Sequence, residues 1–150
     1  MQTSVKNILV AFIVAASMIF TGMAEASEDV TMHKSEGCMC CDKWAEHLHA
    51  YGFKVTTIAE EDLFAFKQKM KVPYELGSCH TAIVGGYVIE GHVPASEIQK
   101  LLAEQPDAIG LSVPRMPAGS PGMDMGSRYD PYDVILFKAD GSVEVYASYK

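Results

Sequence analysis

Three of the four cysteines in this sequence lie within four positions, as Cys38-Met39-Cys40-Cys41. Cys38 and Cys41 form a C-x-x-C motif, and Cys40 is an additional thiol inside it. Four cysteines are too few for a disulfide-scaffold protein, so their clustering indicates chemistry. A helical pattern begins next to them at Asp42, and the positive end of a helix dipole favours thiolate. The chain must therefore hold several reactive sulfurs at one strand-to-helix junction.

The apolar pattern around this cluster predicts alternating strands and helices. The expected elements are, in chain order, a strand at 30–33, a helix at 42–51, a strand at 53–58, a helix at 62–70, strands at 81–84 and 87–90, and a helix at 94–104. Gly85-Gly86 between the last two strands is a two-residue hairpin signal. This β-α-β-α-β-β-α order, with a C-x-x-C motif at its first strand-to-helix junction, predicts an α/β protein with a thioredoxin-like core.

Residues 105–131 differ in character, because they contain five prolines, several glycines and no apolar period. We expect a long loop rich in Met, Pro and Gly, a type that is usually functional when it is not a linker. Two alternating segments follow, at 132–137 and 143–147, and they predict a C-terminal β-hairpin that extends the sheet. The length of 150 residues fits one domain, which we place at 27–150.

The N-terminus has the layout of a secretory signal peptide. Lys6 precedes the apolar run Ile8–Phe20, and Ala24-Glu25-Ala26 matches an A-x-A cleavage pattern. The run is shorter than the roughly 20 residues that span a bilayer, and no later segment approaches that length. We therefore expect cleavage after residue 26, a periplasmic location and no membrane span in the mature chain. Disulfides persist in such a compartment, and a net charge of −7 argues against nucleic acid as a partner.

Cys79 and His80 stand directly before the strand at 81–84, at a junction that faces the C-x-x-C motif in a thioredoxin-like fold. Three interpretations of the sulfurs follow. A structural disulfide between Cys79 and one cluster cysteine would leave two thiols unexplained. A thiol–disulfide oxidoreductase would use Cys38 and Cys41 as its redox pair, although the additional Cys40 invites off-pathway exchange. A soft-metal site would use all four sulfurs.

The methionines favour the metal interpretation, because thiolate and thioether ligands select Cu(I). Met123 and Met125 form an M-x-M pair in the Gly/Pro-rich loop, and Met116 lies in the same loop. The alternative is that these methionines fill gaps where the loop packs on the core. Zinc would fit cysteine and histidine ligands but would not account for the methionines. Among the histidines, His80 is the stronger ligand candidate and His92 the weaker one.

Four segments carry a resemblance to a known family: Gly37–Trp44, Ser78–Ala82, Tyr87–Pro94 and Pro117–Met123. Together they resemble the CopG-type family of small exported proteins associated with bacterial copper resistance. The resemblance covers nearly the whole mature chain. It implies a thioredoxin-like fold, binding of several copper ions at the C-x-C-C site, a role in periplasmic copper detoxification, and cycling of copper between Cu(I) and Cu(II).

The sequence therefore predicts a periplasmic protein that binds Cu(I), more than one ion per chain, for copper resistance. The predicted ligands are Cys38, Cys40, Cys41 and Cys79, completed or capped by His80, Met116, Met123 and Met125. The expected partners are copper ions, together with other periplasmic copper-resistance proteins or a redox partner. Two alternatives stay open: an oxidoreductase acting on thiols or copper, and a copper-transfer module whose methionine loop docks a partner copper protein.

Overall fold

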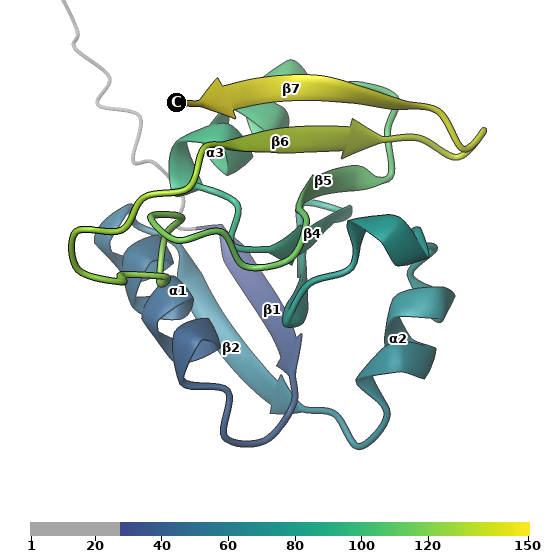
Figure 1. Cartoon of the computed structure of the whole chain (residues 1–150). Coiled ribbons are helices and arrows are strands. Elements are labelled where there is room, and N and C mark those ends of the chain that lie inside the picture. Colours follow the sequence, from purple (N-terminus) through teal and green to yellow (C-terminus); the bar gives the residue numbers. More distant parts are fainter. Residues whose placement is uncertain (1–27) are drawn as a thin grey trace, which may run out of the picture.

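A computed structural model describes residues 28–150. The predicted signal peptide, 1–26, lies outside the described residues. The elements are, in chain order, β1 (Asp29–Lys34), α1 (Met39–Ala50), β2 (Lys54–Ala59), α2 (Leu63–Lys69), the 3-10 helix η1 (Tyr74–Leu76), β3 (His80–Val84), β4 (Tyr87–Gly91), α3 (Ala95–Glu104), β5 (Gly110–Val113), β6 (Tyr132–Phe137) and β7 (Val143–Tyr149). Figure 1 shows the arrangement of the helices and strands, and the strands form one continuous sheet. None of the helices in this part of the chain is long and apolar enough to cross a membrane.

The sheet has seven strands in the order β2-β1-β3-β4-β5-β6-β7. β1 and β2 are parallel and joined through α1, whereas β3 is antiparallel to both β1 and β4. Gly85 and Gly86 both have positive φ, as the tight β3–β4 turn requires. Apart from the short helix η1, the elements from β1 to α3 therefore follow the predicted β-α-β-α-β-β-α order, and the thioredoxin-like core is confirmed.

Residues 105–131, for which the sequence predicts a long loop, contain one further strand, β5. β5 pairs parallel with β4 and antiparallel with β6, so it joins the core to the β6–β7 hairpin. All four of its residues are buried. A strand covered on both faces shows no alternation, and Gly-Leu-Ser-Val is too short for a periodic signal. The predicted C-terminal hairpin is confirmed, and it extends the sheet through β5.

The two faces of the sheet differ in chemistry. One face carries a row of apolar cross-strand neighbours, which packs against buried side chains of α1 and α3: Met32, Ala82, Ile89, Leu111 and Leu136. The opposite face carries the cross-strand row His33, Thr81, Glu90 and Ser112. Phe66 and Lys67 of α2 contact this second row. Side chains alternate between faces along a strand, so His80 points toward α1 while Thr81 points toward α2.

α1 begins earlier than its apolar pattern predicted. The pattern starts at Asp42, but the helix starts at Met39 with Cys38 as its N-cap. Cysteines carry little helix signal of their own, so the sequence could not place this boundary. As a consequence, Cys40 and Cys41 lie in the first turn. The helix is anchored by the buried Trp44, whose Nε1 donates to the carbonyl of Val93, 2.8 Å away.

Candidate metal centre

The four cysteines meet where the start of α1 faces the start of β3. Cys38 and Cys41 form a disulfide, while Cys40 and Cys79 are free. The Sγ atom of Cys79 lies 3.6 Å from that of Cys41 and 3.9 Å from that of Cys40. The Sγ atoms of Cys40 and Cys38 are 3.5 Å apart. All four sulfurs, called here the sulfur group, lie within 4.8 Å of one another.

Lys34 fixes the start of α1 relative to the sheet. This residue ends β1, and its side chain is almost fully buried. Its Nζ donates to the carbonyl oxygen of Cys38 over 3.2 Å and pairs with the Asp42 carboxylate at 2.8 Å. Lys34 thus links the end of β1 to the start of α1 and holds the cysteine-bearing turn against β1. It also places a positive charge beside the backbone of the sulfur group.

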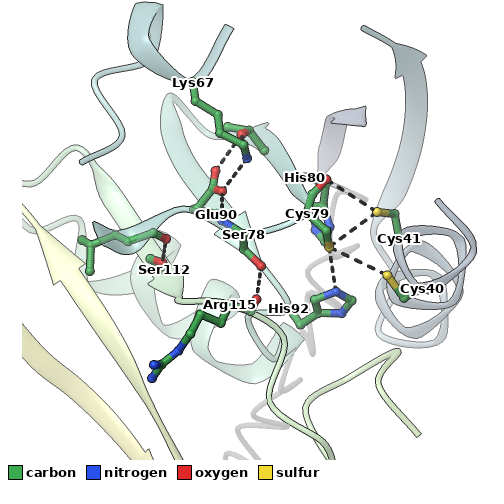
Figure 2. Close-up of polar contacts among 12 residues, drawn as sticks. Cys40, Cys41, Lys67, Ser78, Cys79, His80, Glu90, His92, Ser112 and Arg115 are labelled. Carbon is green, nitrogen blue, oxygen red and sulfur yellow. Dashed lines mark hydrogen bonds and ion pairs between the residues drawn. The ribbon is translucent and has the colours of Figure 1, made fainter. Parts of the chain in front are cut away.

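Two buried histidines share Cys79 and form a second cluster with it, called here the Cys–His group. His92 Nε2 lies 2.9 Å from Cys79 Sγ, and His80 Nδ1 lies 3.3 Å from the same atom. Figure 2 shows Cys79 between the α1 cysteines and these rings. The three ligand atoms of Cys79, His80 and His92 lie within 4.8 Å of one another. The sequence ranked His92 below His80, yet the structure brings both to Cys79.

A hydrogen bond of His92 shows which of its ring nitrogens carries the proton. His92 Nδ1 lies 2.7 Å from the carbonyl oxygen of Pro121. Because a carbonyl only accepts, Nδ1 carries the proton and Nε2 presents a lone pair toward Cys79. A second hydrogen bond of this kind is usual for metal-ligating histidines. The His80 ring lies 4.4 Å from that of Trp44, and its Nε2 has no hydrogen-bond partner within residues 28–150.

Burial keeps these groups uncharged in the absence of metal. It lowers the pKa of His80 well below its ordinary value, and the neighbouring His92 adds to that effect. Burial also lowers the pKa of His92. The Cys79 thiol has its pKa raised to about 12, first by burial and then by the charge of Cys40. At neutral pH the Cys–His group therefore holds neutral imidazoles and a protonated thiol, so a metal ion that binds Cys79 must displace a proton.

The methionine loop, residues 114–131 between β5 and β6, reaches the site with its main chain. Pro121 accepts the hydrogen bond from His92, and a Cβ on Gly122 would lie 2.7 Å from the carbonyl oxygen of Cys40. Met123 follows directly and is partly buried. Met116 and Met125 are 48% and 55% exposed. The fold thus brings the four cysteines and His80 together, and it leaves these two thioethers at the surface.

Neutral imidazole nitrogens and closely spaced sulfurs form a donor set that fits a soft or borderline metal ion. The fold and this centre together define the class: a thioredoxin-like protein with a cysteine–histidine centre at the start of its first helix.

Two solved structures are similar to this chain in sequence and in fold. This chain is 45% identical to the solved structure named Copper resistance protein copG, Form 2, with 83% of this chain and 99% of that chain covered and a TM-score of 0.79. The Form 1 structure is 47% identical, with coverage of 81% and 96% and a TM-score of 0.77. A family model described as "Protein of unknown function, DUF411" matches residues 76–123. No curated protein sequence matches. The chain belongs to the CopG family of copper resistance proteins.

Proposed function

We propose that this protein binds Cu(I) in the periplasm and so contributes to copper resistance. The observation that carries the proposal is the convergence of four sulfurs and two buried imidazoles at one end of the sheet. Membership of a family whose solved structures are named copper resistance proteins supports the same metal. Thiolates prefer Cu(I) to harder ions, and neutral imidazole suits copper as well.

Cys79 belongs to both candidate ligand sets, and this supports binding of more than one ion. One thiolate sulfur can serve two Cu(I) ions, and the Sγ atom of Cys79 lies within 4 Å of Cys40 Sγ, Cys41 Sγ and His92 Nε2. We assign Cys38, Cys40, Cys41 and Cys79 as thiolate ligands, and His80 and His92 as imidazole ligands. The thioethers of the methionine loop, Met116, Met123 and Met125, are proposed as capping ligands.

Use of all four thiolates requires the reduced protein. Reduction of the Cys38–Cys41 disulfide takes two electrons and two protons, which a dithiol partner supplies as it becomes a disulfide itself. Cycling of the bound ion between Cu(I) and Cu(II) would require an external electron acceptor, because sulfur ligands favour the reduced ion. A protein redox partner is therefore part of the proposal.

Replacement of Cys40 by serine tests the multinuclear site, because Cys40 lies outside the disulfide. We expect Cys40→Ser to bind fewer copper ions per chain than the wild type after anaerobic loading with Cu(I), as measured by metal analysis. Met39→Leu is the matched control, because Met39 is the adjacent residue and its side chain is 77% exposed. An unchanged number of copper ions in Cys40→Ser would contradict the thiolate cluster.

A second function is favoured by one observation, the Cys38–Cys41 disulfide at the start of α1. This is the location at which a helix terminus stabilises a reactive thiolate. A thiol–disulfide oxidoreductase would keep its activity toward a disulfide substrate in Cys40→Ser and lose it in Cys38→Ser. The copper-binding function predicts that both variants bind less copper. The same pair of variants therefore separates the two functions.

A further inference from the structure

The polar face of the sheet contains a buried ion pair that the proposed copper site does not use. The Glu90 side chain is fully buried, and Lys67 Nζ of α2 approaches its Oε1 to 2.5 Å. The same Lys67 Nζ donates to Thr81 Oγ1 over 2.9 Å. Lys67 and Ser78 line a hollow of about 530 Å³ that opens beside α2 and η1. Lys67 thus stands between that hollow and the carboxylate.

Glu90 binds both sides of the dipeptide Cys79-His80. Its Oε1 accepts from the backbone N–H of Ser78, 2.6 Å away, and its Oε2 accepts from the hydroxyl of Thr81, also 2.6 Å away. One carboxylate therefore holds the residue before Cys79 and the residue after His80. Figure 2 shows the contact between Glu90 and Ser78. Both sides of the candidate ligand pair are therefore hydrogen-bonded to the same strand, β4.

Glu90 also lies two residues before His92, at the end of β4. Thr81 and Glu90 are direct cross-strand partners in the β3–β4 hairpin. The bracket formed by Ser78, Glu90 and Thr81 thus sets the position of Cys79 and His80 relative to the strand that leads to His92. The 2.9 Å approach between Cys79 Sγ and His92 Nε2 depends on that relative position.

Stability alone does not explain a charge at this location. Burying a carboxylate and an ammonium group is costly, and replacing such a pair by apolar side chains is often neutral or stabilising. Outer residues that orient metal ligands, in contrast, commonly change metal affinity by about 10- to 100-fold when they are replaced. The contacts of Glu90 with Ser78 and Thr81 have the geometry expected of a residue that orients metal ligands.

We propose that Glu90, covered and neutralised by Lys67, is a positioning residue for the copper site: it holds Cys79 and His80 at the distance from His92 that metal binding requires. The inference rests on the proposed copper-binding function. It assigns no ligand beyond those already proposed.

The test compares a double variant, Lys67→Leu/Glu90→Leu, with the wild type. We expect the double variant to fold with a thermal stability close to that of the wild type, because removing both buried charges together offsets the loss of the hydrogen bonds from Ser78 and Thr81. Its Cu(I) affinity, measured by competition with a chromogenic chelator, should fall by about 10- to 100-fold. The control is Lys138→Gln/Glu144→Gln, which removes the ion pair of the C-terminal hairpin. This control should keep the wild-type affinity.

The conservative variant Glu90→Gln keeps the proposal falsifiable if the double variant does not fold. Its amide oxygen can still accept from Ser78, but the NH2 group in the place of Oε2 cannot accept from Thr81 and can only donate to its hydroxyl oxygen. Part of the contact is therefore kept, and the affinity should fall by less than in the double variant. Unchanged Cu(I) affinity in a folded Glu90→Gln or double variant would overturn the proposal. A loss of stability with no change in affinity would equally assign the pair to the fold alone.

The copper-free protein separates failure of this inference from failure of the proposed function. The imidazole nitrogen-15 signals of His92 and His80 report their contacts with Cys79 without any metal. If the wild type binds no copper, the proposed function fails, and these signals still decide the positioning role. Shifted signals in Glu90→Gln would support it, and signals identical to those of the wild type would overturn it.

Discussion

The Cys–His group and the methionine loop both contain side chains that can bind a soft metal, but they differ in solvent exposure. His80 and His92 are fully buried, and each has a nitrogen within 3.3 Å of Cys79 Sγ. Met116 and Met125, in contrast, are about half exposed. The loop nevertheless contacts the site, since Pro121 binds His92 and Gly122 packs on Cys40. The loop therefore contacts the site through the backbone of Pro121 and Gly122, while the thioethers of Met116 and Met125 lie at the surface.

This difference has an energetic meaning. Ligands that packing and hydrogen bonds already hold lose little conformational freedom when a metal binds, whereas an exposed methionine must lose most of its rotamer freedom. We therefore expect copper affinity to depend chiefly on the buried group. The methionines should adjust the affinity or the exchange rate of an ion that the cysteines and histidines have already bound.

The largest effect should come from Cys79, because its sulfur belongs to both the sulfur group and the Cys–His group. We expect Cys79→Ser to lose nearly all bound copper, whereas each histidine variant should lose only part of it. Metal analysis after anaerobic loading measures this directly, and the far-UV circular dichroism spectrum checks the fold. A Cys79→Ser protein that keeps the wild-type copper content would invalidate the central position given to this residue.

The fold was largely predictable because its signals are local. Gly85-Gly86 defines a hairpin on its own, and the alternation of 132–137 needs no distant partner. β5 escaped prediction because Gly110–Val113 is short and buried throughout, so no period distinguishes it from a loop. The core and the C-terminal hairpin follow from sequence pattern, whereas β5, which joins them, depends on tertiary pairing.

The site was less predictable, because its contacts join distant segments. The C-x-C-C cluster and Cys79 were visible as residue types, and the thioredoxin-like element order predicted that they face each other. The contact between His92 and Cys79 depends on where β4 ends beside β3, which spacing alone does not specify. Glu90 showed no signal at all, because an isolated glutamate in a strand pattern is usually read as solvent-exposed.

A substitution at Gly122 would break the contact between the two regions. Gly122 has φ +85°, and an added Cβ would lie 2.7 Å from Cys40 O and 2.8 Å from Trp44 N. Gly122→Ala should therefore lower the free energy of unfolding by about 1–3 kcal/mol, and it should weaken the hydrogen bond from His92 to Pro121. Chemical denaturation measures the first effect.

Gly126→Ala is the matched control for this substitution. Gly126 also has positive φ, at +68°, but an added Cβ there would have no atom within 4 Å. The backbone strain is therefore similar, and only Gly122→Ala adds steric contact with the site. Equal destabilisation by the two variants would mean that the loop does not depend on its contact with α1.

Acid should affect the two regions differently, because histidines titrate and methionines do not. Burial lowers the pKa values of His80 and His92 below the ordinary value of 6.5. Between that value and the folded-state pKa values, the unfolded chain binds protons that the folded chain does not. The free energy of unfolding should therefore fall as the pH drops below about 6.5, by at most about 1.4 kcal/mol per pH unit for each histidine.

Urea denaturation of the copper-free protein at pH 7.5 and pH 5.5 measures this loss. His92→Gln should reduce the pH dependence, because it removes one of the two buried histidines. His49→Gln, at an exposed position of α1, is the control and should leave the dependence as it is. A pH dependence that is the same in His92→Gln and in the wild type would show that His92 is not held neutral by the fold.

The smallest effects should come from the methionines themselves. Leucine has nearly the same volume as methionine and keeps the packing but removes the thioether, so stability should change little in Met116→Leu, Met123→Leu and Met125→Leu. Met123 follows Gly122 and is partly buried, so its replacement should weaken Cu(I) binding most among the three. We expect a loss of less than about tenfold in affinity, or about 1.4 kcal/mol. Chelator competition measures each variant. If the triple leucine variant instead lost copper as completely as Cys79→Ser, the thioethers would be primary ligands, and the loop would have to close over the site as copper binds.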